Sequence, residues 1–381
     1  MAEPKPRYVY IDLLRGWAVL VMVETHVVNA FLLPAIRDAA WFKVLNFING
    51  LVAPSFLFVA GFAFAFIAPR KWSGYLAFDK TFWKQAGRIL QVWLVGYALH
   101  IPFFSFSKLM KYITPDEMLP FWNVDVLHCI AFSLMVLLAC VIIGRTQKRF
   151  FGIVMILFLA TVFFTPILWT TNVDGIFPLP AAMYVNALHG SLFPLFPWMG
   201  FVLGGAITGQ ILTWAKEKKS EPVFFKYVFL GGIAIIFLSL IIEIIPPHLY
   251  PPHDFWRASP EFFFVRFGIV MIILATLWYW EQVAHSGRSI ASIVGMESLV
   301  TYAGHLLVIY GLFFGRHSLS YLIGPTRSLP EVAGMTVILL AATIIAAYVW
   351  SGLKKRSMLQ ARVLQYVLLG IVSYVFFTRP Y

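Results

Sequence analysis

The sequence predicts an all-α protein, a polytopic membrane helical bundle of about 11 transmembrane helices with a cytoplasmic N-terminus. Of its 381 residues, 60% are hydrophobic and only 12% are charged, whereas a soluble domain is about 45 to 50% apolar and about a quarter charged. The mean hydropathy is +0.82. This composition excludes a soluble enzyme. Because each span needs about 20 mainly apolar residues, no separate soluble domain fits, and we predict one transmembrane domain over residues 1–381.

The expected spans are apolar runs bounded by charged residues or proline. They cover residues 10–33, 44–68, 83–104, 120–143, 149–169, 191–213, 223–246, 261–281, 290–314, 330–350 and 358–377. The first run is too long for a cleavable signal and already carries Asp12, Arg15 and His26, so we expect it to be retained as a helix.

Lysine and arginine side chains indicate the orientation, because cytoplasmic loops are enriched in them. With the N-terminus inside, the cytoplasmic segments hold about twice as many of these residues as the opposite side. The formal charge of +12 therefore reflects these loops, and no nucleic-acid partner is expected.

Cys129 and Cys140 lie about 16 Å apart along one predicted helix and cannot bridge each other.

Polar side chains recur on one stripe of the first predicted helix, at alternating steps of three and four residues. The members of this stripe are Asp12, Arg15, Val19, Met22, His26 and Asn29. A charge at the bilayer centre costs at least about 2.5 kcal/mol on insertion scales, so such residues usually face a bundle interior or a water-filled cavity. Alone, Arg15 fits a snorkelling arginine and His26 a neutral packed imidazole. Together on one face they favour a functional role.

Two further sets of polar residues share a helix face. Asp125 and His128 are three residues apart, at the membrane depth of the far end of the first-helix stripe. A carboxylate beside an imidazole can fix its tautomer, and the alternative is a polar helix end near the headgroups. Glu297, Thr301 and His305 step by four. For them the alternative is a hydrogen-bonded packing seam.

The sixth predicted span contains helix-breaking residues. Pro194 and Pro197, together with Gly200, Gly204 and Gly205, predict a break or kink there. Irregular backbone at membrane depth is tolerated where protein or a water-filled cavity surrounds it, and the alternative is an ordinary proline kink with small-residue packing. No HExxH, GxSxG or glycine-rich phosphate loop occurs. We predict no metal site and no tightly bound cofactor.

The opening segment YIDLLRGWAVLVMVETHVVNAF, residues 10–31, resembles the first helix of transmembrane acyltransferases. In the acyltransferase type 3 branch, an arginine and a histidine separated by ten residues form a hallmark, which corresponds here to Arg15 and His26. The wider pattern is similar to the heparan-alpha-glucosaminide N-acetyltransferase-like branch of this superfamily. The segments that carry this similarity are residues 51–66, 123–139, 193–205 and 296–311.

The resemblance implies a membrane-embedded, acyl-CoA-dependent O- or N-acyltransferase of cell-envelope glycans. It would move an acetyl or similar group from cytosolic acyl-CoA to a sugar acceptor on the extracytoplasmic side. Acetyl-CoA is then a co-substrate, the partners are acyl-CoA, a sugar or glycan acceptor and the lipid bilayer, and a homodimer is left open. The connection after the first span has no histidine, so an acetyl-histidine intermediate is not carried over from that position. The short segment before the first span favours a bacterial relative in the cytoplasmic membrane.

These implications divide the candidate site residues into three groups. The catalytic group has His26 as base or acyl acceptor, oriented or assisted by Asp125 and His128. The candidates for binding the CoA phosphates are Arg15, Arg88, Arg70 and Lys71. The candidates for binding the acceptor are Asn29, Glu297 and His305.

A proton-coupled secondary transporter is the alternative function. In it, a buried ionisable relay would include Asp12, Glu24, Glu243, Glu297 and the histidines, and the sixth span would be a broken gating helix. The lack of visible inverted repeats counts against this reading. A purely structural scaffold gives no reason for so many ionisable groups within spans.

Overall fold

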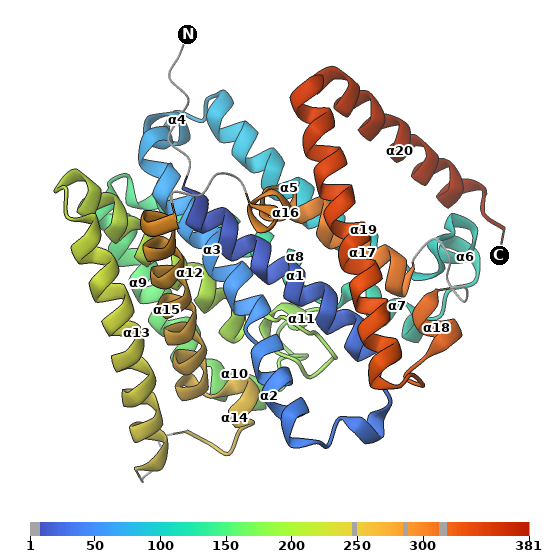
Figure 1. The fold of residues 1–381 in the computed structure, drawn as a ribbon, viewed down its shortest axis with the longest axis horizontal. Coiled ribbons are helices and arrows are strands. Elements are labelled where there is room, and N and C mark those ends of the chain that lie inside the picture. The colour runs from blue at the N-terminus through green and yellow to red at the C-terminus, as the bar shows by residue number, and fades with distance from the viewer. Residues whose placement is uncertain (1–7, 246–249, 285–288, 312–317, 381) are drawn as a thin grey trace. The chain divides into compact units, whose positions relative to one another are not determined.

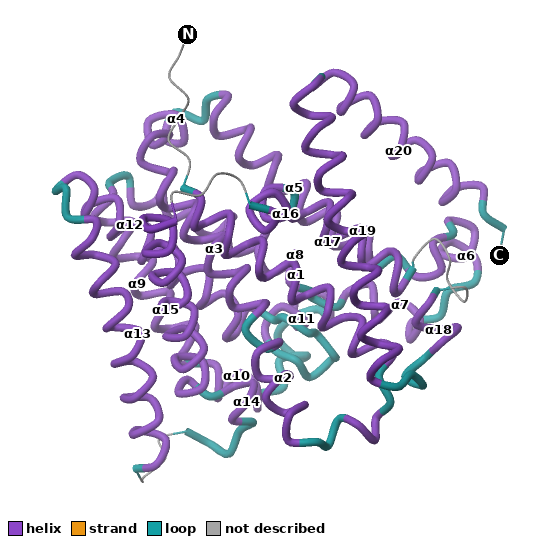
Figure 2. Tube along the Cα trace, in the orientation of Figure 1, coloured by secondary structure: helices purple, strands orange, loops and turns teal. Residues whose placement is uncertain are grey.

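A computed structural model describes residues 8–245, 250–284, 289–311 and 318–380. Within these ranges every regular element is a helix, and a single isolated β-bridge joins Leu32 to Arg327 (Figure 2). The predicted all-α class is therefore confirmed.

Seven of the predicted spans coincide with single helices (Figure 1). These are α1 (Val9–Phe31), α5 (Lys80–Leu99), α12 (Leu195–Glu217), α13 (Glu221–Ile244), α15 (Pro260–Ala284), α19 (Leu329–Arg356) and α20 (Met358–Thr378). The ends of α13, α15 and α20 lie close to the prediction because a long apolar run and the charges that end it are local features. The helix α5 ends earlier than predicted, at Leu99, and α19 continues further than predicted, to Arg356.

The other four predicted spans are each divided into two helices. The pairs are α2 (Ala40–Asn49) with α3 (Val52–Ile67), α7 (Pro115–Trp122) with α8 (Val126–Gly144), α9 (Gln147–Phe163) with α10 (Thr165–Thr170), and α16 (Ile290–Met296) with α17 (Ser298–Tyr310). The last pair is bent by 87° at Glu297. Residues 312–314 of that predicted span lie outside the described residues.

Short helices connect the longer ones. They are α4 (Trp72–Leu76), α6 (Phe106–Lys111), α11 (Leu179–Val185), α14 (Phe255–Ala258) and α18 (Leu319–Ile323), with 3-10 turns at Pro34–Ile36, Ala68–Lys71 and Pro102–Phe104.

Seven helical stretches in the described ranges are long and apolar enough to cross a membrane, or eight if the bent pair α16 and α17 is one span. They are Ala40–Leu76 (α2 to α4), α8, α12, α13, α15, α19 and α20. The predicted spans in α1, α5 and α9 are not among them. α1 carries Asp12, Arg15 and Glu24, and α9 has 17 residues. The total of eleven and the cytoplasmic N-terminus stay predictions.

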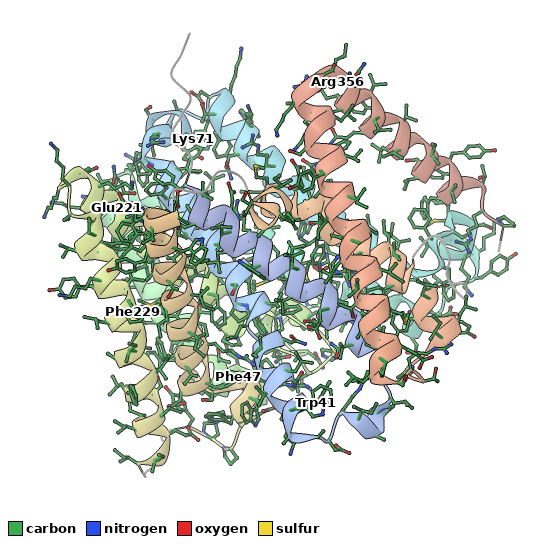
Figure 3. All side chains as sticks on the ribbon, viewed as in Figure 1. Trp41, Phe47, Lys71, Glu221, Phe229 and Arg356 are labelled. Atoms are coloured by element: carbon green, nitrogen blue, oxygen red, sulfur yellow. The ribbon has the colours of Figure 1, made fainter. Side chains whose placement is uncertain are left out.

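Large apolar side chains are exposed along several of these helices. On α13 they include Tyr227, Phe237 and Ile244, and on α20 Leu359 and Tyr366. Figure 3 shows the side chains along both helices. Exposed apolar surface of this extent is typical of helices that face lipid.

The chain forms two compact units by its contacts. Unit 1 comprises Met1–Val52, Ala98–Phe121 and Ser286–Tyr381, and unit 2 comprises Ala53–Tyr97 and Trp122–His285. The single transmembrane domain over residues 1–381 stays a prediction.

Unit 1 is built on close packing between α1 and α16. A Cβ atom added to Gly16 would overlap the backbone of Ala291, and one added to Gly295 would overlap the backbone of Asp12. Only glycine allows the two backbones to approach this closely. Towards the C-terminal end of α1, a buried hydrophobic cluster joins it to α2, α17 and α19. The cluster is Val27, Val28, Ala30, Phe31, Leu32, Phe42, Ile309 and Val332.

Unit 2 has a comparable glycine contact between α3 and α12. A Cβ on Gly61 would overlap the Val202 backbone, and one on Gly205 would overlap the Phe58 backbone. Gly204 lies against the ring of Phe267, which belongs to a group of contacting phenylalanines on α3, α9 and α15. These contacts fix α12 in the centre of unit 2.

The predicted distortion of the sixth span lies in the first turn of α12. Pro194 caps the helix, and Phe196 has non-helical backbone angles (φ −98°, ψ 118°) just before Pro197. Most residues of α12 up to Leu212 are buried, and Gly204 and Gly205 serve helix packing. The geometry therefore corresponds to the alternative of a proline distortion with small-residue packing.

Candidate functional site

Unit 1 brings together two imidazoles and a phenol, from α1 and α17. The Nδ1 atom of His26 lies 3.3 Å from the hydroxyl oxygen of Tyr310. The ring centroids of His26 and His305 are 5.3 Å apart. His26 is half-buried, and His305 is only 2% exposed. The two helices thus place three polar rings in one partly enclosed group, the His26 cluster (His26, His305 and Tyr310).

The end of α1 that carries His26 is held by backbone and side-chain hydrogen bonds. Arg37 donates to the carbonyl oxygens of Leu32 at 2.8 Å and Asn29 at 3.1 Å, which would otherwise lack partners at the helix end. The Arg327 backbone N–H donates to the Phe31 carbonyl at 2.8 Å. These bonds fix the last turns of α1 and therefore the position of the His26 ring.

The tautomer of His305 follows from its hydrogen bond. Its Nδ1 lies 2.8 Å from the carbonyl oxygen of Thr301, and a carbonyl can only accept, so Nδ1 carries a proton. In the neutral ring, Nε2 then has a lone pair. This Nε2 is buried and has no hydrogen-bond partner among the described residues. A buried acceptor left unpaired costs free energy, which is typical of a group kept for a ligand or a reaction.

The predicted polar face of α17 is present and buried. Glu297, Thr301 and His305 are 6%, 2% and 2% exposed. The Thr301 hydroxyl donates to the Glu297 carbonyl at 3.2 Å, and the Glu297 carboxylate pairs with Lys354 Nζ at 2.5 Å. Through this ion pair, Glu297 connects the bend between α16 and α17 to the C-terminal end of α19. His305, on the same face, belongs to the His26 cluster.

The predicted stripe on α1 changes environment along its length. Asp12, Val19 and Met22 are buried, Arg15 and His26 are half-buried, and Asn29 is exposed. The stripe thus passes from the contact with α16 near Asp12 to a more open end beyond His26.

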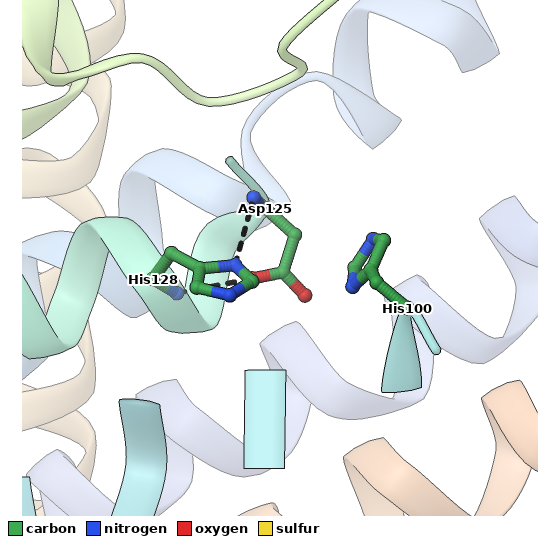
Figure 4. A group of neighbouring side chains, drawn as sticks. All are labelled: His100, Asp125 and His128. Carbon is green, nitrogen blue, oxygen red and sulfur yellow. Dashed lines mark hydrogen bonds and ion pairs between the residues drawn. The ribbon is translucent and has the colours of Figure 1, made fainter. Parts of the chain in front are cut away.

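Asp125 and His128 are adjacent, as their spacing predicts, and they form the N-terminal cap of α8 in unit 2 (Figure 4). Asp125 Oδ1 accepts the His128 backbone N–H at 3.0 Å, and the Asp125 backbone N–H donates to His128 Nδ1 at 3.2 Å. This reciprocal arrangement is a capping box. The His128 ring also stands edge-on to Tyr97, with centroids 4.2 Å apart. This geometry corresponds to the alternative given above, a polar helix end. That Asp125 and His128 orient or assist His26 stays a prediction.

Three of the four residues predicted to bind CoA lie in unit 2. Arg70 and Lys71 end the 3-10 turn after α3, and Arg88 lies on α5. Arg70 and Arg88 are exposed and Lys71 is half-buried. Exposed guanidinium groups are suited to phosphate because they offer several donors in one plane. The fourth, Arg15, lies in unit 1 on α1.

Sequence reasoning did not single out Tyr310. It lies five residues after His305, off the i, i+4 face, and no local pattern distinguishes it from other tyrosines in apolar segments. Its role in the His26 cluster arises because α17 packs on α1.

The chemistry open to the His26 cluster follows from its two kinds of ring. An imidazole beside a phenol can act as a base or as an acyl acceptor, with its ring orientation held by the phenol hydroxyl.

The chain is similar to a known protein family. The family model described as "Heparan-alpha-glucosaminide N-acetyltransferase, catalytic" matches residues 7–242, which is more than half of the chain. The match includes Arg15 and His26 and ends before His305 and Tyr310. No curated protein matches the chain. The candidate span helices and the family together describe an integral membrane protein. The chain belongs to the heparan-alpha-glucosaminide N-acetyltransferase catalytic family, a family of membrane acetyltransferases.

Proposed function

We propose that this protein transfers an acetyl or similar acyl group from cytosolic acyl-CoA to a sugar acceptor on the extracytoplasmic side, with His26 as the catalytic base. The observation that carries the proposal is the His26 cluster: a histidine in the family-matched segment, in contact with Tyr310 and beside the buried lone pair of His305.

The contact with Tyr310 supports a separate role for each nitrogen of His26. When Nδ1 donates its proton to the Tyr310 oxygen, Nε2 keeps a lone pair and acts as the base. Nε2 removes the proton of the acceptor group as that group attacks the thioester carbonyl. The C–S bond then breaks, and the CoA thiolate takes up the proton. Direct attack by Nε2 on the thioester, which forms an acyl-imidazole, is the second route open to the same atom.

His305 is proposed to bind the acceptor through Nε2. Because Thr301 fixes the tautomer, this atom is an acceptor for a hydroxyl or amino hydrogen of the sugar. Asn29, exposed beyond His26, is a further proposed contact to the acceptor. Glu297 is assigned a positioning function through its ion pair with Lys354.

The donor is proposed to bind at the cytoplasmic end. With eleven spans and the N-terminus inside, Arg15 lies near the cytoplasmic mouth and His26 about 16 Å further along α1. Arg15 would bind a CoA phosphate, and the pantetheine arm would reach inward along α1 to His26. Arg70, Lys71 and Arg88 of unit 2 are further candidates for phosphate binding. We place the protein in a bacterial cytoplasmic membrane, where the donor pool lies on that side.

The test measures release of the CoA thiol from acetyl-CoA by the full-length protein in lipid nanodiscs, with N-acetylglucosamine or glucosamine as acceptor. His26→Ala should lower acceptor-dependent release at least about a hundredfold, the scale of general-base catalysis. His189→Ala is the matched control, since His189 pairs with Asp174 in unit 2, outside the proposed site. Full turnover in His26→Ala, or no release by the wild type with either sugar, contradicts the proposal.

A further inference from the structure

Arg266 of unit 2 lies on α15, one of the helices long and apolar enough to cross a membrane. Its side chain is half-buried. The central carbon of the guanidinium group, Cζ, is 4.0 Å from the centroid of the Phe262 ring and 5.8 Å from the Trp198 ring on α12. A charged residue within a transmembrane helix is costly, and such residues are usually paired and functional.

The two aromatic rings do not satisfy the hydrogen-bonding capacity of Arg266. A ring face attracts the positive charge, but it offers no oxygen to the five N–H donors, which lie in the plane of the guanidinium group. Among the described residues, Arg266 forms no ion pair and no hydrogen bond. Donors that are shielded from water without an acceptor cost free energy. An anion beside Arg266 would remove this cost.

The carboxylates of the same region have other partners. Asp254, at the start of α14, acts on Arg266 electrostatically, but it pairs with Arg257 at 3.6 Å. Glu261, in the first turn of α15, accepts the Ser259 hydroxyl at 2.8 Å. Neither forms an ion pair with Arg266 in the described structure, so the anion would have to be a ligand.

Trp198 supplies a second donor without an acceptor. Its indole Nε1 is buried and has no hydrogen-bond partner within the described ranges. Close packing fixes α12 against α15 here, since the ring centroids of Phe201 and Phe263 are 4.3 Å apart. The guanidinium and the indole N–H therefore lie on adjacent, rigidly packed helices. Because both groups can only donate, they suit a ligand that can only accept.

The position of Arg266 along α15 indicates the class of anion. With eleven spans and the N-terminus inside, α12 and α15 both begin on the extracytoplasmic side, and Arg266 lies roughly 9 Å along α15 from that end. Trp256, which contacts the Phe262 ring at a centroid distance of 4.8 Å, is 61% exposed. Exposed tryptophan is typical of the headgroup level of a bilayer, towards which arginine side chains extend. Phosphate groups lie at that level, and a guanidinium binds phosphate through two parallel N–H groups.

We propose that Arg266 and Trp198 form a binding site for a phosphate group, namely that of a phospholipid headgroup in the extracytoplasmic leaflet. The guanidinium donates two hydrogen bonds to phosphate oxygens, and the Trp198 N–H donates a third. The Phe262 ring supports the face of the guanidinium. The site uses no residue of the proposed acyl transfer, so it stands or fails independently of that function. A free phosphate ion has the same chemistry, and the experiment below separates the two sources.

Thermal unfolding in the presence of defined lipids tests the site. The full-length protein is delipidated in a neutral detergent, and its melting temperature is measured with phosphatidylglycerol, with diacylglycerol of the same acyl chains, or with inorganic phosphate. Native mass spectrometry counts the lipid molecules that stay bound. Arg266→Gln removes the charge. Arg257→Gln is the matched control, since that arginine is exposed and pairs with Asp254.

Phosphatidylglycerol should raise the melting temperature of the wild type and of Arg257→Gln, as a ligand of the native state must. Diacylglycerol, which lacks the phosphate, should not. Arg266→Gln should bind phosphatidylglycerol at least about tenfold more weakly. Without lipid, it should unfold at the wild-type temperature or above, because the unpaired charge is gone.

Two results would overturn the proposal. An equal loss of stability in Arg266→Gln with and without phosphatidylglycerol would mean that the arginine only packs against the aromatic rings. Equal stabilisation of the wild type by phosphatidylglycerol and diacylglycerol would mean that the phosphate is not recognised. A shift with inorganic phosphate that equals the lipid shift and is lost in Arg266→Gln would assign the site to a free phosphate ion and overturn the lipid headgroup as ligand.

Trp198→Phe gives a second test that does not depend on the folding of Arg266→Gln. The substitution keeps an aromatic ring beside Arg266 and removes the N–H donor. It should weaken the binding of phosphatidylglycerol about threefold, the scale of one neutral hydrogen bond. Wild-type affinity in Trp198→Phe would exclude the indole from the site.

Discussion

His26 and Tyr310 are 284 positions apart in the chain, yet the Nδ1 atom of one lies 3.3 Å from the hydroxyl of the other. The contact joins α1, which carries His26 within the family-matched segment, to the end of α17.

Tyr310→Phe should lower kcat about tenfold, since the ring stays in place but Nδ1 of His26 loses the oxygen that orients it. KM for acetyl-CoA should be unchanged. Steady-state kinetics on the nanodisc-reconstituted protein check this, with Tyr348→Phe on the exposed side of α19 as control. Equal kcat for Tyr310→Phe and wild type would show that the hydroxyl does not orient the base.

His305→Leu should remove activity without lowering the melting temperature. The substitution eliminates a buried acceptor without a partner in the described structure, worth about 1 to 3 kcal/mol, and loses one hydrogen bond to Thr301, worth about 0.5 to 1.5 kcal/mol. Thermal unfolding and turnover are measured on the same preparation. A large drop in melting temperature would mean that His305 serves mainly to stabilise the fold.

Gly16→Ala should destabilise the protein, because the added methyl group meets the backbone of Ala291, which cannot move independently of α16. Gly334→Ala on α19 is the matched control, since no atom lies within 4 Å of its Cβ position. In a helix that control should be neutral or stabilising by up to about 1 kcal/mol. Similar melting temperatures for the two variants would contradict the close packing of α1 on α16.

Glu297→Gln should lower stability by about 1 to 3 kcal/mol, because it removes the negative charge that pairs with Lys354 and leaves at most a neutral acceptor for its ammonium group. Lys354→Met in the same background should add little further loss, since the ion pair is already lost. KM for the acceptor should stay the same in both variants. A raised KM for the acceptor with unchanged stability would instead assign Glu297 to substrate binding.

Acetyl-CoA should raise the melting temperature of the wild-type protein, as a ligand of the native state must. Arg70→Ala or Arg88→Ala should weaken this shift, because each removes a cation proposed to bind CoA phosphate. Arg257→Ala is the control, since that arginine is exposed and pairs with Asp254. No shift at saturating acetyl-CoA would favour the transporter alternative over an acyltransferase.

Helix boundaries were predictable where the determining features are local. The long apolar stretches of α13, α15 and α20 each end close to charged, proline or polar residues, and their predicted limits lie within a few residues of the observed ones. The bend at Glu297 was not predictable, because the residues around it are compatible with a continuous helix. Its partner Lys354 is 57 positions away, and only packing brings the two together.

The candidate site divides in the same way. Helical periodicity alone places Glu297, Thr301 and His305 on one face, and the sequence resemblance alone points to Arg15 and His26. That Asp125 and His128 form a helix cap, and that Tyr310 reaches His26, became visible only in three dimensions. The physical reason is that the periodicity of a sequence indicates only which side of its own helix a residue occupies. Which residue contacts it on that side depends on how helices distant in the chain pack against each other.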